Sequence, residues 1–398
     1  MLNSFSLDKY KGFGDQQLIE LKPITLLYGE NNSGKSSLAR FLPSLKENYK
    51  YNHTSFYPIG MLGKANKNFI YGNSRESYFE LNYDDMNIKY SFHIINEDVI
   101  INQIVIQDIE GNIETFNLDL DSFNYCLELN PQEKFTIKNM IPLLNHSNLC
   151  EKLYDKFEKI SKGVFWISPL RYIPKPIEVF NNIKMSKESD GADAIQILAS
   201  SVKGNKKVFK IVDQWIGKIF QQKIDLGFSA VGDYQVFTTN ISPISFENIK
   251  VPIAESGMGV SQILPILVLC AQLIVGEIKE ESYLIFENPE LHLHDALHKE
   301  LAQIFAEVIS KVNSTKIIIE THSEVLLQAI QLEVIKNTIN FESVSINWIK
   351  KIGEKNIVER VNINNDGQLD ENWPATAFQT SNNLAKKHVI ELLARGQE

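Results

Sequence analysis

One stretch of this chain, residues 29–36, limits what the protein can fold into more than any other. It reads GENNSGKS and fits the pattern G-x-x-x-x-G-K-[ST] at every fixed position. The apolar residues 24–28 before it favour a buried strand, and the apolar spacing of residues 36–45 favours a helix. A strand, a glycine-rich turn and a helix in this order direct backbone N–H groups toward phosphate. The pattern therefore predicts a nucleoside triphosphate site.

Each fixed position of this loop has a predicted role. Gly29 and Gly34 let the backbone turn tightly around the phosphates. The Lys35 ammonium is expected to contact the β- and γ-phosphates, and the Ser36 hydroxyl is expected to bind Mg²⁺. The predicted nucleotide-binding residues of the loop are Gly29, Glu30, Asn31, Asn32, Ser33, Gly34, Lys35, Ser36 and Ser37.

The composition indicates a folded protein of more than one lobe. With 398 residues, 43% of them hydrophobic, the chain is long enough for two or three lobes and a sizeable interior. The formal net charge of −9 gives no general attraction to nucleic acid, so any contact with DNA or RNA would be local. We interpret the lysines at 203, 206, 207 and 210 as a solvated face rather than a nucleic-acid patch.

The cysteines and the apolar runs indicate a cytoplasmic protein without a membrane segment. Cys126, Cys150 and Cys270 are far apart and lack C-x-x-C spacing, so neither a disulfide framework nor a zinc site is indicated. The longest apolar run, residues 263–275, is too short to span a bilayer and favours a buried helix. We therefore expect a cytoplasmic location.

The first half of the chain predicts strands followed by helices. We expect strands at residues 2–7 and 17–28, before the phosphate-binding loop. Residues 68–121 alternate apolar and polar side chains with period two, which predicts an antiparallel sheet. Residues 132–162 and 192–222 are expected to be helical.

The last third alternates short apolar strands with helices. Strands are expected at residues 283–286 and 315–319, and helices at 295–311 and 324–335. This β-α-β-α order favours a parallel sheet whose strand ends carry the ligand site.

Three further motifs extend the predicted site. Residues 255–262, ESGMGVSQ, place Ser256, Gly257 and Gly259 at the start of a helix, where exposed N–H groups bind anions. The strand at 283–286 leads to Glu287, a carboxylate expected to hold Mg²⁺ through water. The strand at 315–319 leads to Glu320-Thr-His322-Ser, which places an imidazole where it could hydrogen-bond the γ-phosphate.

These motifs, weak one by one, occur in the order found in ABC-class ATPases. The segments GMGVSQILP, FENPELHLH and IIIETHSE resemble those of stand-alone ABC-class, AAA-family ATPases grouped with the OLD and SMC-like proteins. Many members of that group serve bacterial defence against phage. Residues 168–171, SPLR, resemble the segment before the group's helical subdomain, and residues 366–374 resemble a short domain that closes many such chains.

The resemblance implies an α/β fold: an ABC-type ATPase head with a mixed sheet, an antiparallel β subdomain and a helical subdomain. No heptad repeat persists, so no long coiled coil is expected. We place lobe I with the antiparallel subdomain at residues 1–170, and the helical subdomain with its connecting strands at 171–250. Lobe II follows at 251–350, and a C-terminal extension at 351–398.

The resemblance also implies a mechanism. Two heads would form a homodimer or higher homo-oligomer, with each ATP between the Lys35 loop of one head and the Ser256 turn of the other. Asn288 stands where many relatives carry a water-orienting glutamate, and an amide cannot accept a proton, so hydrolysis is expected to be slow. The predicted cofactors are ATP and Mg²⁺. The predicted catalytic residues are Lys35, Glu287, Asn288 and His322, and the predicted metal ligands are Ser36 and Glu287.

Two other polar clusters have plainer interpretations. His292, His294 and His298 with Asp295 could suggest a metal site, but structural or dimer contacts are the preferred interpretation. Three acidic residues resemble a nuclease cluster only superficially, because alternate carboxylates on a strand share one solvated face. These residues are Glu114, Asp119 and Asp121.

The leading functional hypothesis is an ATP-dependent sensor or scaffold of a prokaryotic anti-phage system, similar to the ATPase subunits of Septu, retron-associated or PARIS-type systems. We recognise no HNH, Toprim or other catalytic module in the chain, so the effector would be a separate nuclease or toxin. The alternative is an SMC-like DNA repair or chromosome-maintenance ATPase that clamps DNA. A transporter subunit is disfavoured because Gln262 comes late in the serine-glycine motif and no membrane-coupling feature is evident.

Overall fold

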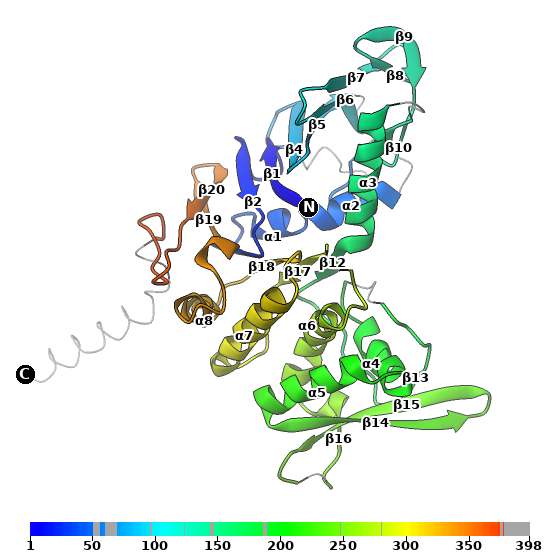
Figure 1. Ribbon diagram of the computed structural model, residues 1–398, viewed down its shortest axis with the longest axis vertical. Helices are drawn as coiled ribbons and strands as arrows, with labels where there is room; N and C mark the ends of the chain where they lie inside the picture. The colour runs from blue at the N-terminus through cyan, green and yellow to red at the C-terminus, as the bar shows by residue number, and fades with distance from the viewer. Residues whose placement is uncertain are drawn as a thin grey trace, which may run out of the picture.

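The structure of the protein is a computed structural model with three connected regions (Figure 1). A central sheet lies between a large antiparallel sheet and a helical region that carries a long hairpin. The structure describes residues 1–50, 56–59, 70–95, 98–122, 124–143, 147–185, 189–246, 248–279, 281–374 and 377.

The central sheet has six strands in the order β12-β17-β18-β3-β19-β20. All neighbouring pairs are parallel except the last, β19 with β20. Strands β3, β17 and nearly all of β18 are buried, as expected for parallel strands covered on both faces. The bounds are β12 Val164–Ile167, β17 Tyr283–Glu287, β18 Lys316–Glu320, β3 Ile24–Gly29, β19 Val344–Ile352 and β20 Lys355–Val361. The predicted parallel sheet is confirmed, and the carboxyl ends of β3, β17 and β18 lie at one edge.

Alternate side chains of β3 enter two different hydrophobic cores. Leu26 and Tyr28 belong to the core formed with α4 to α8, whereas Leu27 belongs to the core formed with α1 to α3 and the antiparallel sheet. The helices of the second core are α1 Lys35–Ala39, α2 Phe41–Lys50 and α3 Asn148–Gly163. Those of the first are α4 Asp193–Lys203, α5 Lys207–Phe220, α6 Met258–Ile274, α7 Asp295–Lys311 and α8 Glu324–Ile335. The central sheet is therefore covered on both faces.

The antiparallel sheet has eight strands in the order β2-β1-β4-β5-β6-β7-β8-β9. Its bounds are β1 Leu2–Asp8, β2 Gln17–Glu20, β4 Glu76–Tyr83, β5 Met86–Ile95, β6 Asp98–Asp108, β7 Ile113–Asp119, β8 Asn124–Leu127 and β9 Asn130–Phe135. The antiparallel sheet expected within residues 68–121 is confirmed from β4 onward, and residues 68 and 69 lie outside the described part. The expected strand at 17–28 is divided into β2 and β3.

The helix expected from residue 132 begins later, at α3. Residues before it form β9 and a small two-stranded sheet of β10 Ile137–Lys138 and β11 Ile141–Pro142. The prediction was wrong here because the alternation of buried Phe135 and Ile137 with exposed Lys134 and Lys138 has the period of a strand. Likewise, the helical stretch expected at 192–222 is divided between α4 and α5.

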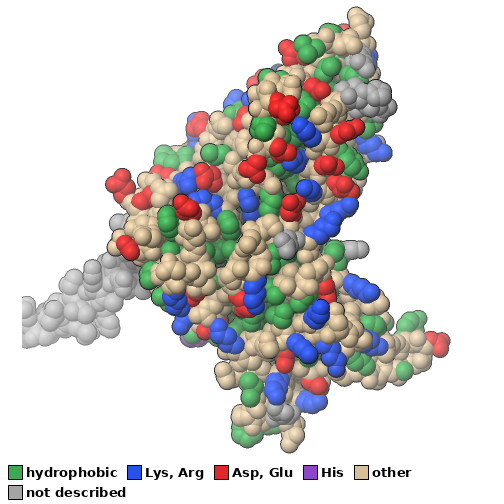
Figure 2. All heavy atoms as spheres, viewed as in Figure 1, with side chains coloured by type: hydrophobic (Ala, Val, Ile, Leu, Met, Phe, Trp, Pro, Cys, Tyr) green, Lys and Arg blue, Asp and Glu red, His purple; other side chains and the backbone are tan. Residues whose placement is uncertain are grey.

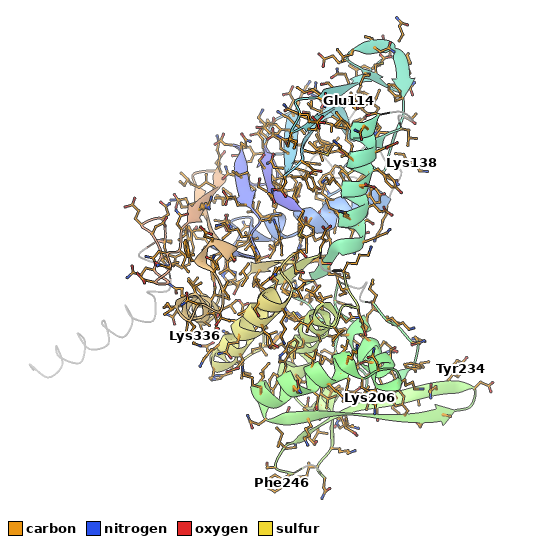
Figure 3. All side chains as sticks on the ribbon, viewed as in Figure 1. Glu114, Lys138, Lys206, Tyr234, Phe246 and Lys336 are labelled. Carbon is orange, nitrogen blue, oxygen red and sulfur yellow. The ribbon has the colours of Figure 1, made fainter. Side chains whose placement is uncertain are left out.

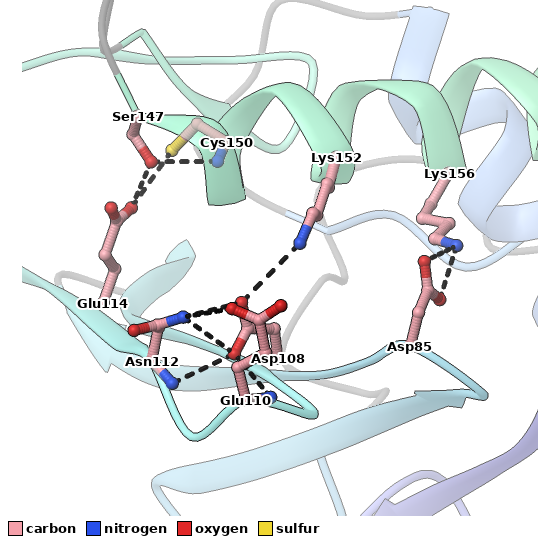
Figure 4. A network of polar contacts seen from close by, with 9 residues as sticks. All are labelled: Asp85, Asp108, Glu110, Asn112, Glu114, Ser147, Cys150, Lys152 and Lys156. Carbon is pink, nitrogen blue, oxygen red and sulfur yellow. Dashed lines mark hydrogen bonds and ion pairs between the residues drawn. The ribbon is translucent and has the colours of Figure 1, made fainter.

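Polar contacts fix α3 onto the antiparallel sheet (Figure 4). The Ser147 hydroxyl accepts a hydrogen bond from the Cys150 amide at 3.0 Å and donates one to Glu114 at 2.5 Å. One and two turns further along, Lys152 and Lys156 pair with Asp108 at 3.6 Å and Asp85 at 2.6 Å.

The three acidic residues that resemble a nuclease cluster have separate surroundings. Glu114 accepts the Ser147 bond, whereas Asp119 accepts bonds from Ser122 and Lys134, and Asp121 is exposed in the following turn. The three carboxylates therefore do not form one cluster, and the expected shared strand face is wrong for Asp121, because β7 ends at Asp119.

The helical region carries a long hairpin that projects from the molecule (Figure 1), and Tyr234 lies at its tip (Figure 3). Its strands are β14 Gln222–Val231 and β15 Tyr234–Pro243, with short partners β13 Glu178–Val179 and β16 Val251–Pro252. Two single-turn helices, η2 Ile253–Glu255 and η3 Phe341–Ser343, complete the described elements. Among the described helices the longest have 17 residues, so this part of the chain holds no long coiled coil.

The lysines near the α4–α5 turn are exposed, and on the face shown in Figure 2 Lys and Arg side chains gather over this region. Lys203 hydrogen-bonds Gln235 and lies over the rings of Phe180 and Phe228, at 4.6 and 4.8 Å from their centroids. At least one member of this cluster therefore packs the hairpin against α4.

A C-terminal segment packs beside the central sheet. The Trp373 ring lies 5.5 Å from Tyr28 of β3 and 5.2 Å from Trp348 of β19, measured between ring centroids. The fold class is thus as predicted, with a mixed sheet, an antiparallel subdomain and a helical subdomain. The domain boundaries at 170, 250 and 350 remain predictions. In the part of the chain that the structure describes, no helix combines the length and the apolar character needed to cross a bilayer.

Candidate nucleotide site

The glycine-rich loop joins β3 to α1 as the sequence predicts. Gly29 has φ +149°, and a Cβ atom there would lie 1.9 Å from the carbonyl oxygen of Ile349. Gly34 precedes α1 with φ +97°. Only glycine fits at position 29, because other residues rarely adopt its backbone conformation and a side chain would collide with the backbone of β19.

Lys35 lies inside this loop and is nearly buried. Its ammonium group donates hydrogen bonds to the carbonyl oxygens of Gly29 at 3.0 Å and Glu30 at 2.6 Å. Burial lowers the pKa of the Lys35 ammonium, while Glu320 and Glu30 oppose that effect. The loop thus holds a positive charge at its centre.

A pocket of about 310 Å³ lies over the loop. Seven predicted residues of the loop line it together with His322 and with Glu320, which was not among the predicted site residues. The loop residues that line it are Asn31, Asn32, Ser33, Gly34, Lys35, Ser36 and Ser37. The phosphate-binding loop and the end of β18 therefore form one site.

Glu320 is the last residue of β18, the strand beside β3. The Ser36 hydroxyl donates a hydrogen bond to its Oε1 at 2.7 Å. Its Oε2 is buried and has no hydrogen-bond partner among the described residues. Burial first, and then the nearby Glu287, raise the pKa of the Glu320 carboxyl to about 7. The sequence signal that could have identified Glu320 is its position as a carboxylate at the end of a buried strand, since that strand lies next to the loop strand.

Glu287, at the end of β17, is only 1% exposed and is surrounded by donors. Arg40 donates from Nε to Oε1 at 2.7 Å and from Nη2 to Oε2 at 2.6 Å. The Trp166 indole N–H donates to Oε1 at 2.7 Å. Arg40, which ends α1, and Trp166, which lies in the neighbouring strand β12, were not among the site residues predicted from the sequence.

Asn288 follows Glu287 in the left-handed region, with φ +44°. Its amide N–H donates to the Glu320 carbonyl oxygen at 2.7 Å, and its side-chain Oδ1 is buried without a partner among the described residues. Asparagine adopts this backbone conformation more readily than most residues.

Arg171 connects this strand end to α6. Its Nη2 donates to the carbonyl oxygens of Glu287 at 2.9 Å and Asn288 at 2.8 Å, and its Nη1 donates to the carbonyl oxygen of Gln262 at 3.3 Å. Burial lowers the pKa of the Arg171 guanidinium to about 10, which leaves it charged at neutral pH. Arg171 of the segment 168–171 therefore links the end of β17 to α6, the helix that follows the Ser256 turn.

His322 lies at the pocket, just beyond the end of β18. Its amide N–H donates to Glu290 Oε1 at 2.8 Å, which fixes the backbone that carries the imidazole. Partial burial, followed by the charge of Lys35, lowers the pKa of the imidazole. A neutral ring, able to donate or accept a hydrogen bond, is therefore expected at pH 7.

The second anion-binding motif lies apart from this pocket. Gly257, with φ +88°, precedes α6, which begins at Met258, so the helix starts within the serine-glycine segment, before the apolar run at 263–275. The Ser256 hydroxyl donates to the carbonyl oxygen of Ile253 at 2.8 Å. Neither Ser256, Gly257 nor Gly259 lines the pocket over the loop.

The histidines after β17 make structural contacts. The His298 ring is buried, with Nδ1 2.8 Å from the Ser323 hydroxyl. His294 caps α7 by accepting a bond from the Ala296 amide. Within the described residues, no group of three or more His, Cys, Asp or Glu side chains could hold a metal ion. His294 and His298 thus make contacts within the chain, and the dimer contacts that the sequence also allowed stay a prediction.

The comparison with known families identifies an ATPase domain. The model of the AAA ATPase domain matches residues 147–327, which include α6, β17 and β18 but not the phosphate-binding loop. Over this stretch the chain is similar to AAA ATPase domains, and the glycine-rich loop lies before it in the sequence. A search of curated proteins returned no match.

Solved structures with a similar arrangement are head domains of SMC proteins. The SMC head domain from Thermotoga maritima is 13% identical with a TM-score of 0.44, covering 91% of this chain and 99% of that chain. An SMC head bound to the C-winged helix domain of ScpA is 14% identical with a TM-score of 0.46, covering 91% and 97%. An SMC head from Pyrococcus furiosus, bound to the C-terminal domain of ScpA, is 13% identical with a TM-score of 0.44, covering 91% and 96%.

Proposed function

We propose that the protein binds ATP, hydrolyses it slowly, and uses the bound state to pair two copies of its head and control a separate effector. The observation that carries this proposal is the pocket in which the loop of Lys35 and Ser36 meets Glu320 and His322. We assign the protein to prokaryotic anti-phage defence on its resemblance to the defence ATPases, with a nuclease or toxin as the effector. ATP binding would then report the trigger to the effector.

The residues present fit ATP with a divalent cation. Mg²⁺ prefers oxygen ligands, and the pocket offers the Ser36 hydroxyl and a carboxylate whose Oε2 is buried without a partner in the described part of the chain. When bound, the cation would neutralise charge on the phosphates. Lys35 would contribute a second positive charge, and a neutral His322 would contribute a hydrogen bond. The carboxylate in the pocket is that of Glu320, whereas the sequence predicts Glu287 as the metal-binding acid.

The position of the Ser256 turn supports pairing of two heads. Ser256, Gly257 and Gly259 form the N-terminus of a 17-residue helix, an arrangement that attracts anions, yet they do not line the pocket of their own chain. A second copy could bring this turn to the phosphates and surround them with donors from both sides. We therefore propose a homodimer, with larger assemblies built from it.

Slow hydrolysis is expected because Asn288 replaces a proton acceptor. The wild-type protein should turn over ATP well below ~1 per second, and Asn288→Glu should raise that rate at least about tenfold by supplying a general base. Phosphate release under saturating ATP and Mg²⁺ measures both rates. Asn288→Gln is the matched control, since it imposes the same backbone strain without a proton acceptor. A wild-type rate like that of a fast motor ATPase would refute the proposal of slow hydrolysis.

The division of labour between ATPase and effector makes a second prediction. Because the proposal assigns the effector activity to a separate nuclease or toxin, the purified chain with ATP and Mg²⁺ is expected to leave plasmid DNA intact. Cells that carry the chain together with its neighbouring genes should resist phage, as measured by plaque counts. Cells that carry the chain alone should not. Degradation of DNA by the purified chain would contradict a separate effector.

A further inference from the structure

We propose that Glu320, and not Glu287, supplies the carboxylate that binds the nucleotide's divalent cation, together with the Ser36 hydroxyl. This inference rests on the proposed function, since it concerns the cation of the same site. It places the metal-binding acid on β18, the strand directly beside the loop strand, rather than on β17, one strand further away.

Glu320 has the position and the free oxygen that a metal ligand needs. It pairs in register with Leu27 of β3, two residues before the loop, and it lines the pocket. Its Oε1 already contacts Ser36 at 2.7 Å. Its Oε2 is buried and accepts no hydrogen bond from any described residue. A buried polar atom without a partner is unfavourable, and a cation bound there would satisfy it.

Glu287, in contrast, has both of its oxygens in use. Oε1 accepts bonds from Arg40 and Trp166, and Oε2 accepts a second bond from Arg40. This two-bond guanidinium pairing is the geometry in which arginine binds a carboxylate most strongly. Glu287 does not line the pocket over the loop. Moving it onto a cation would leave the Arg40 charge without its partner.

The Arg40–Glu287 pair has a different role, which is to position the loop. Arg40 lies between α1 and α2, and its guanidinium is 5.6 Å from the Trp166 ring centroid. The pair therefore ties the helix after the phosphate-binding loop to the ends of β17 and β12. Arg40 and Glu287 are positioning residues that keep Ser36 opposite Glu320.

The chemistry of Mg²⁺ requires no second acid. This cation commonly binds proteins through one or two carboxylates, and takes its remaining ligands from phosphates and water. Ser36 and Glu320 supply one hydroxyl and one carboxylate at the wall of the same pocket. A nucleotide in that pocket would supply the phosphate oxygens.

The test compares Mn²⁺ binding by two variants of the full-length chain. Mn²⁺ is titrated into protein saturated with a nonhydrolysable ATP analogue, and free Mn²⁺ is measured by electron paramagnetic resonance. Glu320→Gln keeps an acceptor for Ser36 but removes the charge, so Mn²⁺ affinity should fall at least about tenfold. Glu287→Gln should change Mn²⁺ affinity by less than about threefold, because an amide oxygen can still accept from Arg40. Thermal unfolding verifies that each variant is folded.

Metal-free binding of a fluorescent ATP analogue, measured in EDTA, separates this inference from the proposed function. Wild type and Glu320→Gln should bind it equally well. If wild type binds no nucleotide with or without metal, the proposed function and this inference both fail. If Glu287→Gln loses Mn²⁺ while Glu320→Gln retains it, only this inference is overturned. Where Glu320→Gln does not fold, Arg40→Gln, which breaks the same pair but keeps the Glu287 carboxylate, is compared with Glu287→Gln. Mn²⁺ affinity that is retained in Glu287→Gln, or that falls equally in both variants, supports Glu320, and affinity lost in Glu287→Gln alone excludes it.

Discussion

Lys35→Ala is expected to lower the affinity for ATP at least about 100-fold, which corresponds to ~2.7 kcal/mol. The Lys35 ammonium lies inside the loop, where it donates to the carbonyl oxygens of Gly29 and Glu30. Phosphate oxygens are stronger acceptors for an ammonium group than neutral carbonyls, so these bonds can exchange when ATP binds. Alanine removes the charge and also leaves two loop carbonyls without their donor. Hydrolysis should fall below detection for the same reason.

Titration with a fluorescent ATP analogue measures the affinity of Lys35→Ala, and thermal unfolding verifies that the variant is folded. The matched control is Lys50→Ala, which removes the same charge from the exposed end of α2. Lys50 pairs with Glu47 on the surface, at 2.7 Å, and does not line the pocket. Its replacement should leave ATP affinity within about twofold, because exposed ion pairs contribute little. An equal affinity of Lys35→Ala and wild type would place the nucleotide elsewhere.

The parts of the site that depend on local pattern could be predicted from the sequence. The loop of residues 29–36 specifies its own backbone, because Gly29 and Gly34 are needed for the turn and β3 precedes it. The positions of Glu287 and His322 at strand ends followed from short apolar runs between helices. Each of these inferences uses contacts close in the chain, for which residue spacing is sufficient.

The parts that depend on strand order could not be predicted in the same way. That Glu320 contacts Ser36 follows from β18 lying beside β3, a pairing between segments about 290 residues apart. Arg40 was missed because its partners Glu287 and Trp166 lie on β17 and β12. No local periodicity indicates which buried strand will be the neighbour of another. The apparent helix at 132–142 failed differently, because its charged residues concealed a strand alternation of buried Phe135 and Ile137.

The contacts of Arg171 could not be predicted from the SPLR segment in which it lies. The SPLR segment was assigned only by resemblance, yet its arginine joins the carbonyl oxygens of Gln262, Glu287 and Asn288. A buried guanidinium thus joins α6, the helix that follows the Ser256 turn, to the end of β17, which lies beside β18. The proposed pairing of two heads requires such a connection, because the turn of each chain would sense the ATP of its mate.

Ser256→Arg should therefore abolish pairing of heads without unfolding the single chain. Ser256 lies partly exposed at the start of α6, and its hydroxyl makes one local bond, to the carbonyl oxygen of Ile253. A long cation in that position would occupy the space that the proposed arrangement reserves for the partner's loop and phosphates. Sedimentation with a saturating nonhydrolysable ATP analogue should show a dimer for wild type and a monomer for Ser256→Arg. Nucleotide affinity of the monomer should stay within about threefold, since Ser256 does not line its own chain's pocket.

Ser229→Arg, which adds the same side chain at an exposed position of the β14 hairpin strand, should still form the dimer. A Ser256→Arg dimer as stable as that of wild type would show that the serine turn does not face a second head.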